Sequence, residues 1–155
     1  MNRRKFTAAL GGVAAWSVAA HAQQGDRVRR IGVLMPFDEN DPFWKLQLSA
    51  FTQALADLGW ADGRNVRIDL RWAGGDLNRI RALAQGLVGL QPDIIVASGT
   101  RATAALQRET RTIPIVFVNV GDPVASGIVA ALNQPGGHIT GFGYLEASLG
   151  GAPAP

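Results

Sequence analysis

Three short polar segments hold the side chains best suited to bind a ligand. They are residues 36–41, 98–100 and 119–122, and each directly follows a predicted β-strand. Hydroxyl and amide groups can hydrogen-bond a carboxylate and aspartates can pair with an ammonium group, so this combination suits a small zwitterion. The predicted ligand-binding residues are Asp38, Asn40, Asp41, Ser98, Gly99, Thr100, Asn119 and Asp122.

A structural role is an open alternative for most of these residues. Ser98 and Thr100 have side chains typical of helix N-caps, although a cap can also bind a ligand. Asp41 and Asp122 each precede a proline, and this arrangement is typical of a helix start. The carboxylates of residues 36–41 can also be solvated loop charges.

Motifs for catalysis are missing from the chain. It has no G-x-x-x-x-G-K-[ST] phosphate loop, no G-x-G-x-x-G after the first strand and no G-x-S-x-G nucleophile turn. It has no cysteine and only two histidines, His21 and His138, which excludes thiolate metal sites and makes a histidine-rich one unattainable. We therefore predict a protein that is not an enzyme and holds neither metal nor cofactor.

The elements that must position the polar segments alternate between strand and helix. The predicted strands are residues 30–35, 65–72, 93–97, 112–118 and 138–143. The predicted helices are residues 42–58, which Asp41 would cap, residues 77–90, which Asp76 would cap, a segment starting at residue 101, and residues 124–132. Trp44, in the first helix, can either line a pocket by stacking or belong to the core.

Hydrophobic patterning indicates how these strands are arranged. Ile94, Ile95 and Val96 form a continuous apolar run, as expected for a parallel strand covered on both faces. Residues 65–72 instead alternate between apolar and polar side chains, which is typical of an edge strand. The pattern predicts an α/β three-layer sandwich with a parallel sheet of order 2-1-3-4-5. All three polar segments then meet at the carboxyl edge of the sheet, where such folds bind ligands.

Composition limits the class of partner. The chain has 155 residues, is 47% hydrophobic and only 17% charged, so one domain with a real core is expected. Arg3, Arg4 and Lys5 account for the whole excess of basic over acidic residues. Because the remaining charges balance and no basic stripe is visible, we predict no binding to nucleic acid.

Residues 1–22 have the pattern of an export signal. A basic start precedes an apolar run, and Ala20-His21-Ala22 resembles a signal-peptidase site, with cleavage expected after Ala22. Residues 2–6, Asn-Arg-Arg-Lys-Phe, resemble a twin-arginine signal, and an ordinary Sec signal is the alternative. The apolar run is too short to span a bilayer, which takes about 20 residues. The expected product is exported to the periplasm and does not span the membrane.

Four segments in a fixed order carry a resemblance to a known family. They are IGVL, AFTQALADLGWADGRNV, RIRALAQGLVGLQPDIIVASGTRAT and TIPIVFVNVGDPVASGIVAALNQPGGHITG. Together they resemble ABC-transporter substrate-binding proteins with the type I periplasmic-binding-protein fold, in the branch with tryptophan- and phenylalanine-binding members. The resemblance covers residues 30–148.

The resemblance implies two α/β lobes that close by a hinge on a small solute, such as an amino acid, and deliver it to a membrane permease driven by an ATPase. The first lobe would contribute the same three polar segments. The expected organisation is a signal in residues 1–22, a linker in 23–29, the first lobe in 30–144 and a tail or truncated hinge in 145–155. The second lobe would be missing. The alternatives are a stand-alone flavodoxin-like sensor or interaction domain and, third, a nucleotide-dependent transferase.

Overall fold

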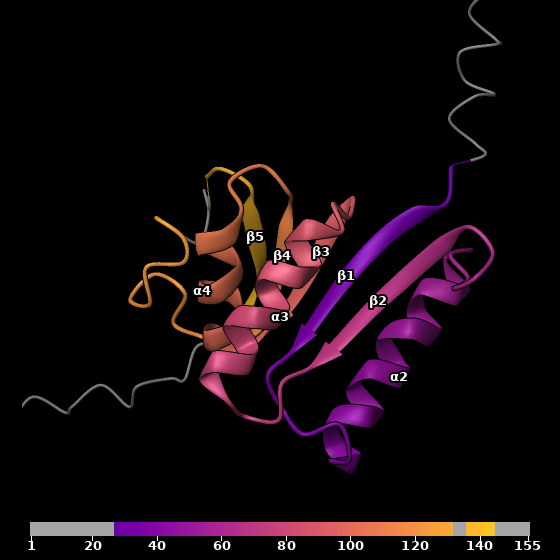
Figure 1. The fold of residues 1–155 in the computed structure, drawn as a ribbon, viewed down its shortest axis with the longest axis horizontal. Coiled ribbons are helices and arrows are strands. Elements are labelled where there is room, and N and C mark those ends of the chain that lie inside the picture. Colours follow the sequence, from indigo (N-terminus) through magenta and orange to yellow (C-terminus); the bar gives the residue numbers. More distant parts are fainter. Residues whose placement is uncertain (1–26, 132–135, 145–155) are drawn as a thin grey trace, which may run out of the picture.

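The structure is a computed structural model that describes residues 27–131 and 136–144, and Figure 1 shows the path of the chain. The predicted signal and tail therefore lie outside the described residues. The strands are β1 (Arg29–Met35), β2 (Val66–Trp72), β3 (Ile94–Ser98), β4 (Ile115–Gly121) and β5 (Ile139–Tyr144). The helices are α2 (Pro42–Asp57), α3 (Leu77–Gly89) and α4 (Gly99–Glu109).

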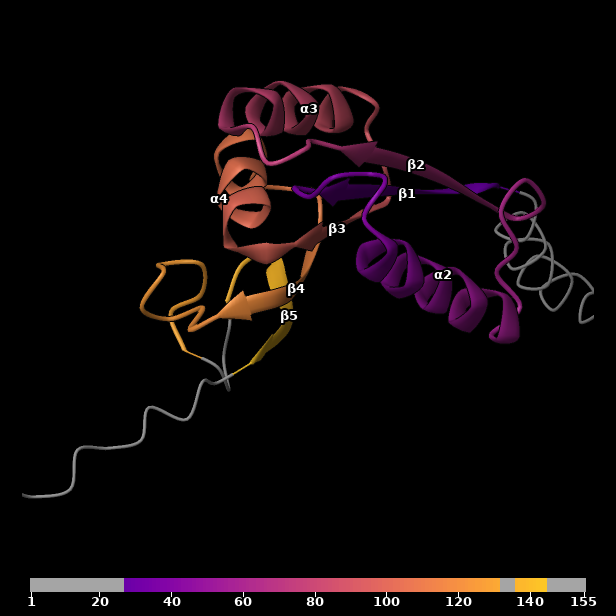
Figure 2. The same cartoon turned by 90° about the horizontal axis from the view of Figure 1, so that it is seen from below.

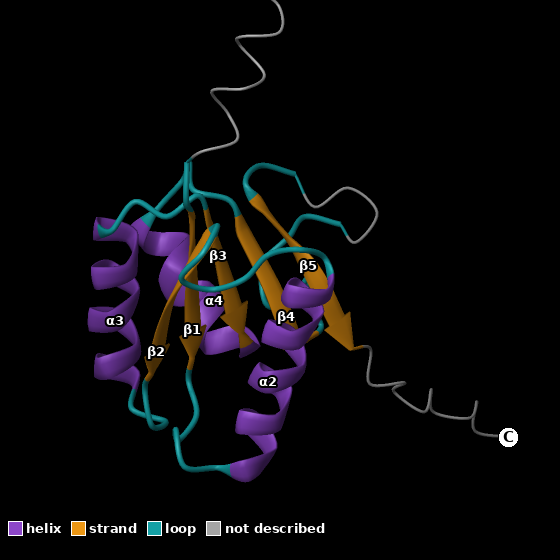
Figure 3. Cartoon of the chain, turned by 90° about the vertical axis from the view of Figure 1, so that its right-hand side faces the viewer, coloured by secondary structure: helices purple, strands orange, loops and turns teal. Residues whose placement is uncertain are grey.

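One parallel sheet organises the described part of the chain. Its strand order is β2-β1-β3-β4-β5, and every neighbouring pair is parallel, so all five arrows in Figure 3 point the same way. Helices α3 and α4 cover one face and α2 lies on the other (Figure 2). The predicted α/β fold and strand order are confirmed, and β2 is the edge strand that its alternating pattern predicted.

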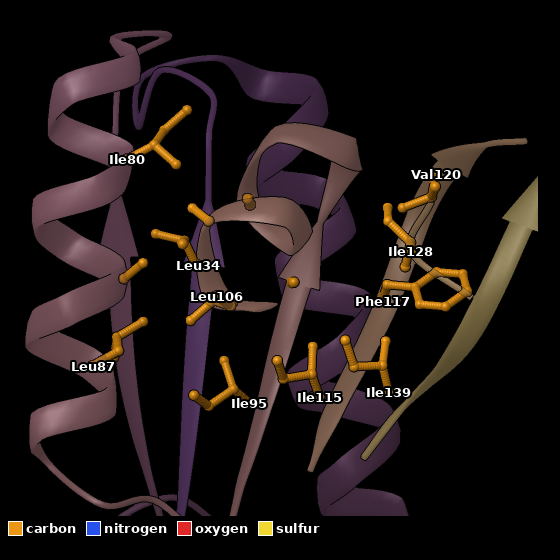
Figure 4. Packing of buried hydrophobic residues seen from close by; sticks show 14 of the residues in the cluster. Leu34, Ile80, Leu87, Ile95, Leu106, Ile115, Phe117, Val120, Ile128 and Ile139 are labelled. Atoms are coloured by element: carbon orange, nitrogen blue, oxygen red, sulfur yellow. The ribbon is translucent and has the colours of Figure 1, made fainter. Parts of the chain in front are cut away.

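The hydrophobic core lies between the sheet and the pair α3 and α4 (Figure 4). Leu87 and Leu106 on the helices, with Ile95 and Ile115 on the strands, are all 0% exposed. Fully burying a leucine or isoleucine side chain contributes about 1.5–3 kcal/mol each, so this layer dominates the stability of the fold.

The starts of α2 and α3 follow from their capping residues. The Asp41 carboxylate accepts a hydrogen bond from the backbone N–H of Phe43 at 2.9 Å, directly before the proline that begins α2. The Asp76 carboxylate accepts from the backbone N–H groups of Asn78 and Arg79 at 2.7 and 2.9 Å. Both predicted N-caps are confirmed, and each satisfies backbone donors that a helix start leaves free.

Two predicted boundaries around β4 are wrong. The strand starts at Ile115, after Pro114, and it continues through residues 119–121, which were predicted to be loop. The predicted helix at residues 124–132 is a series of turns in its described part, residues 124–131. Gly127 has φ +68° there, and Ile128 and Val129 are 4% and 5% exposed in the core. Burial of this β-branched pair outweighs the helical pattern.

An arginine cluster surrounds Asp93 at the amino edge of the sheet. The Asp93 carboxylate accepts the backbone N–H of Arg30 at 2.8 Å and forms ion pairs with Arg29 and Arg27 at 3.3 and 3.2 Å. The Arg30 N–H, followed by the guanidinium groups of Arg29 and Arg27, holds the pKa of Asp93 below its ordinary value. The cluster joins the start of β1 to the start of β3.

Candidate functional site

Two of the predicted ligand-binding residues are in direct contact at the carboxyl edge of the sheet. Asn119, near the end of β4, donates a hydrogen bond from Nδ2 to the Ser98 Oγ at the end of β3, over 3.3 Å. These strands are neighbours in the sheet, and Ser98 pairs with Val118 in the register. The contact therefore follows from the parallel topology, as the sequence predicted.

Asn119 reaches this position through a β-bulge. Its φ is +56°, and the register between β4 and β5 shifts between Val118 and Val120. Asparagine tolerates this left-handed backbone better than most residues, which favours it at a bulge. The bulge turns the amide of Asn119 away from the core and leaves it exposed.

Ser98 occupies the N-cap position of α4 without capping it. Its hydroxyl forms no hydrogen bond to the helix, and the residue is only 1% exposed. Ser98 therefore has the backbone position of an N-cap but does not make its hydrogen bond. Its side chain contacts Asn119 instead. A buried hydroxyl with a single side-chain partner keeps hydrogen-bonding capacity for another group.

Gly99, at the start of α4, lies against the first loop. Its φ is +78°, and a Cβ there would lie 3.8 Å from Pro36 Cγ and 4.0 Å from Phe37 Cζ. The left-handed backbone, more than the available space, favours glycine at this position. Thr100, the next residue, is half-buried in the first turn of α4.

The acidic residues of the first loop make local hydrogen bonds. Asp38 accepts from the backbone N–H of Asn40 at 2.7 Å, and Asp41 caps α2. Asp38 and Asn40 are exposed. The hydrogen-bond partners of Asp38 and Asp41 lie within the loop and the start of α2, which agrees with the structural alternative, while the exposure of Asp38 and Asn40 leaves both accessible to a ligand.

Asp122 likewise binds its own turn. Its carboxylate accepts from the backbone N–H of Ala125 at 2.9 Å, and its backbone carbonyl accepts from Ser126 at 3.0 Å. Its φ is +37°. The predicted helix start is therefore the first in a series of turns, and the side chain of Asp122 is exposed at the edge of the sheet.

An aromatic pair stands beside these polar groups. The rings of Phe37 and Trp44 stack with centroids 3.5 Å apart and planes 2° from parallel, and Phe43 packs edge-on against Trp44. Phe37 and Trp44 are half-buried. Trp44 therefore stacks on a residue of its own chain and lies outside the buried core, so a pocket-lining role for it stays a prediction; Phe37 was not predicted. The sequence signal that could have singled out Phe37 is the presence of a large apolar residue in an otherwise acidic loop.

The loop after β2 also belongs to this edge, although the sequence did not single it out. The backbone N–H of Gly74 donates to Phe37 O at 2.9 Å, and that of Gly75 donates to Pro36 O at 2.6 Å. The backbone N–H groups of Arg79 and Asn78 hold the pKa of Asp76, next in the chain, below its ordinary value. Its carboxylate is therefore ionised at neutral pH.

An apolar groove of about 590 Å³ leads away from Ser98 and Asn119, between α2 and the open face of the sheet. Its walls include Met35 and Phe51, with Val118 on the sheet. A pocket with an apolar body and a few polar groups at one end can hold a small organic molecule. The arrangement offers binding groups, but no pairing of a nucleophile with a base.

Two further tests concern the described residues alone. Within residues 27–131 and 136–144, no three His, Cys, Asp or Glu side chains lie close enough together to hold a metal ion. None of the helices in this part of the chain combines the length and apolarity needed to cross a membrane.

Comparison with protein families gives a match over most of the chain. Residues 31–148 fit the family model described as ABC transporter substrate binding protein. A curated relative, the tyrosine-binding protein of Clostridioides difficile (strain R20291), is 37% identical over 91 residues. That alignment covers 59% of this chain and 26% of the relative.

Solved structures agree with this match. A conserved domain protein from Vibrio cholerae O1 biovar El Tor (strain N16961) superposes with a TM-score of 0.72 at 31% identity, over 77% of this chain and 40% of that one. The ABC domain of Streptococcus pneumoniae in complex with L-Trp gives 0.69 at 29%, over 74% and 38%. The chain thus spans less than half the length of these relatives.

Proposed function

Because the chain belongs to the ABC transporter substrate-binding protein family, we propose that it supplies one lobe of an exported protein that binds an amino acid for uptake. Members of this class bind and deliver solutes and are not enzymes, which agrees with the predicted absence of catalysis. The transport interpretation is favoured over the flavodoxin-like and transferase alternatives by the family match.

The observation that carries the proposal is the hydrogen-bonded pair of Ser98 and Asn119 at the carboxyl edge of the sheet. Hydroxyl and amide groups bind the polar end of an amino acid, and the exposed carboxylates of Asp38 and Asp122 can attract its ammonium group. Parallel α/β sheets bind their ligands at this edge.

An aromatic amino acid is the solute that the surroundings favour. Phe37, which stacks on Trp44, lies next to Gly99 and places an aromatic ring close to Ser98. Aromatic rings gain about 0.5–1.5 kcal/mol from such stacking beyond the area they bury. The curated relative is a tyrosine-binding protein, and one solved relative holds L-Trp.

A second lobe would complete the site by closing over the solute. The chain covers about 40% of a solved relative, and a single wall leaves a bound solute exposed to water on its other side. Hinge closure of two lobes removes that water and stabilises the bound state. The completed protein would deliver its solute to a membrane permease and its ATPase, after export directed by residues 1–22.

A titration of the mature chain, residues 23–155, tests the proposal. Trp44 becomes the sole tryptophan of this chain in a Trp60→Phe, Trp72→Phe background, so its fluorescence reports on the site. We expect L-tryptophan analogues without indole fluorescence, L-tyrosine and L-phenylalanine to perturb this signal with weak, millimolar affinity. No response to any amino acid would contradict the proposal, and tight binding would contradict the need for a second lobe.

Asn119→Gly sharpens the test because glycine accepts the backbone φ of +56° while losing the amide. Loss of one hydrogen bond to the solute is expected to weaken binding about tenfold. Asn78→Ala, an exposed asparagine on α3, is the matched control and should leave the affinity unchanged. Equal solute affinities for the Asn119→Gly and Asn78→Ala variants would show that Asn119 does not contribute to binding.

A further inference from the structure

Arginines gather on the two helices that cover the core side of the sheet. Helices α3 and α4 lie side by side there (Figure 2) and together carry four arginines against a single glutamate, Glu109. The opposite side has the reverse balance, because the first loop and α2 together carry four carboxylates and one lysine. The described part of the molecule is therefore basic on one side and acidic on the other, and its basic side attracts anionic groups.

Three of these arginines surround one small pocket. It measures about 170 Å³, lies between α3 and α4, and is bordered by Arg81, Arg101 and Arg108, which we call the rim arginines. Its floor is apolar, with Ile80 of α3 only 1% exposed and Ala105 of α4 only 7% exposed. The pocket is therefore an apolar depression inside a positively charged border.

The rim arginines have no partner among the described residues. Within residues 27–131 and 136–144, every ion pair involves Asp69 or Asp93 and none includes a rim arginine. The arginine side chains that donate hydrogen bonds in this part of the chain are also other ones. A guanidinium group has five N–H donors in a planar fork that fits a carboxylate, so the rim arginines keep this capacity for another group.

The spacing of the rim arginines indicates the shape of a partner. Arg101 and Arg108 are seven residues apart on α4, so they lie on the same side of the helix and about 10 Å apart along its axis. Two carboxylates placed two turns apart on another helix have the same spacing, and an apolar side chain in the turn between them can reach the pocket floor. A phosphate-rich surface, such as a membrane or a nucleic acid, offers the charges but no apolar side chain between them.

We propose that α3 and α4 form a docking surface for an acidic amphipathic helix of a partner protein. Two carboxylates of that helix pair with Arg101 and Arg108, and its apolar side chain enters the pocket beside Arg81. The pocket shares no lining residue with the groove at Ser98 and Asn119, so a solute bound there does not occupy it. The proposal concerns an interaction surface and does not depend on the identity of the solute.

A designed peptide tests this surface on the mature chain, residues 23–155. The probe is a fluorescent, alanine-rich helix with two glutamates seven positions apart and a leucine four positions after the first glutamate. Fluorescence anisotropy should show binding with a dissociation constant of about 100 μM or below at a salt concentration of about 50 mM. The affinity should fall as added salt screens the charge pairs.

Arg101→Gln and Arg108→Gln should each weaken binding of the peptide about threefold, and the double variant about tenfold, as expected for exposed charge pairs. Arg64→Gln is the matched control, because it removes the same charge from an exposed arginine outside the pocket. Its affinity for the peptide should equal that of the wild type, and circular dichroism would verify that all variants are folded. Equal losses in Arg64→Gln and in the rim variants would show a general charge effect and contradict the proposal.

Changes to the probe separate the sources of binding. Serine in place of the leucine should weaken binding about threefold, because the pocket floor loses its apolar contact, and glutamine in place of both glutamates should abolish binding. No binding of the original peptide at a concentration of about 1 mM would overturn the proposal. So would equally effective competition by phosphatidylglycerol vesicles or by a DNA oligonucleotide, because the surface would then attract any anion.

Discussion

The two faces of the sheet share the same strands yet are covered very differently. On the side of α3 and α4, Leu87, Leu106 and Ile115 are 0% exposed. On the side of α2, the helix buries no residue, and three of the valines that face it, Val96, Val116 and Val118, are only half-buried. Both faces of β3 and β4 carry apolar side chains, so the apolar content of a face does not by itself decide whether that face becomes the core.

The difference separates stability from binding within one small fold. The closely packed face contributes most of the burial that holds the strands together. The open face ends at Ser98 and Asn119, which line the groove. A binding surface needs space and unused polar groups, and the loosely covered face has both. Substitutions should therefore reduce stability strongly on one face and weakly on the other.

The largest effect is expected for Leu106→Ala on α4. This side chain is 0% exposed, and its truncation should lower the free energy of unfolding by about 3 kcal/mol, as expected for a core leucine that leaves a cavity. Leu48→Ala on α2, whose side chain lines the groove and is half-buried, should cost less than about 1 kcal/mol. Urea unfolding measures both, and similar costs would contradict the contrast.

Gly141→Ala probes the packed side of β5. A Cβ at this position would overlap the backbone O of Phe117 and lie 2.7 Å from both its N and its Cγ atoms. Backbone atoms cannot move aside cheaply, so we expect a loss of about 2 kcal/mol in thermal or urea unfolding. Gly74→Ala has no atom within 4 Å of its Cβ and provides a control for backbone strain alone, at φ +62°.

Asn119→Ala tests how much the left-handed backbone of the β4 bulge costs. Alanine at φ +56° should lower the free energy of unfolding by about 1 kcal/mol relative to Asn119→Gly, because left-handed geometry is unfavourable for a residue with a Cβ. The two variants lose the same amide, so their difference in chemical denaturation isolates the backbone. Equal stability would mean that the bulge relaxes when the amide is removed.

The smallest effect belongs to Asp93 at the amino edge, away from both faces. Its folded pKa lies below the ordinary value of 3.8, so the ionised form stabilises the fold fully above that pH and less as the pH falls through the folded value. Asp93→Asn should cost about 0.5 kcal/mol at pH 7, because its arginine partners are largely exposed, and the difference from the wild type should shrink below about pH 3.8. A constant difference across the acid range would contradict this.

Sequence patterns were sufficient to predict the elements in which local chemistry and burial favour the same structure. The run Ile94-Ile95-Val96 predicted a central strand, the alternation in β2 predicted an edge, and Asp41 and Asp76 predicted two helix starts. The Ser98–Asn119 contact followed because parallel strands end at one edge. These features depend on short-range patterns and on one topological rule.

Other features depended on packing that local patterns do not contain. Residues 124–131 form turns because Ile128 and Val129 are drawn into the core. The exposure of α2 could not be predicted from the helical spacing of its apolar residues. Such a pattern shows which side of a helix can be buried, but not whether another part of the protein packs against it. The continuation of β4 past Val118 required a bulge, which no periodicity marks.

That bulge has an evolutionary consequence. Val118 faces the groove and Val120 is 0% exposed, so Asn119 is the one extra residue that keeps strict alternation from placing an amide in the core. Deleting its codon would restore a continuous ladder with β5 and keep Val120 at a core position. Lineages of this fold could therefore acquire or lose a polar binding residue through a single in-frame insertion or deletion, with little change to the core.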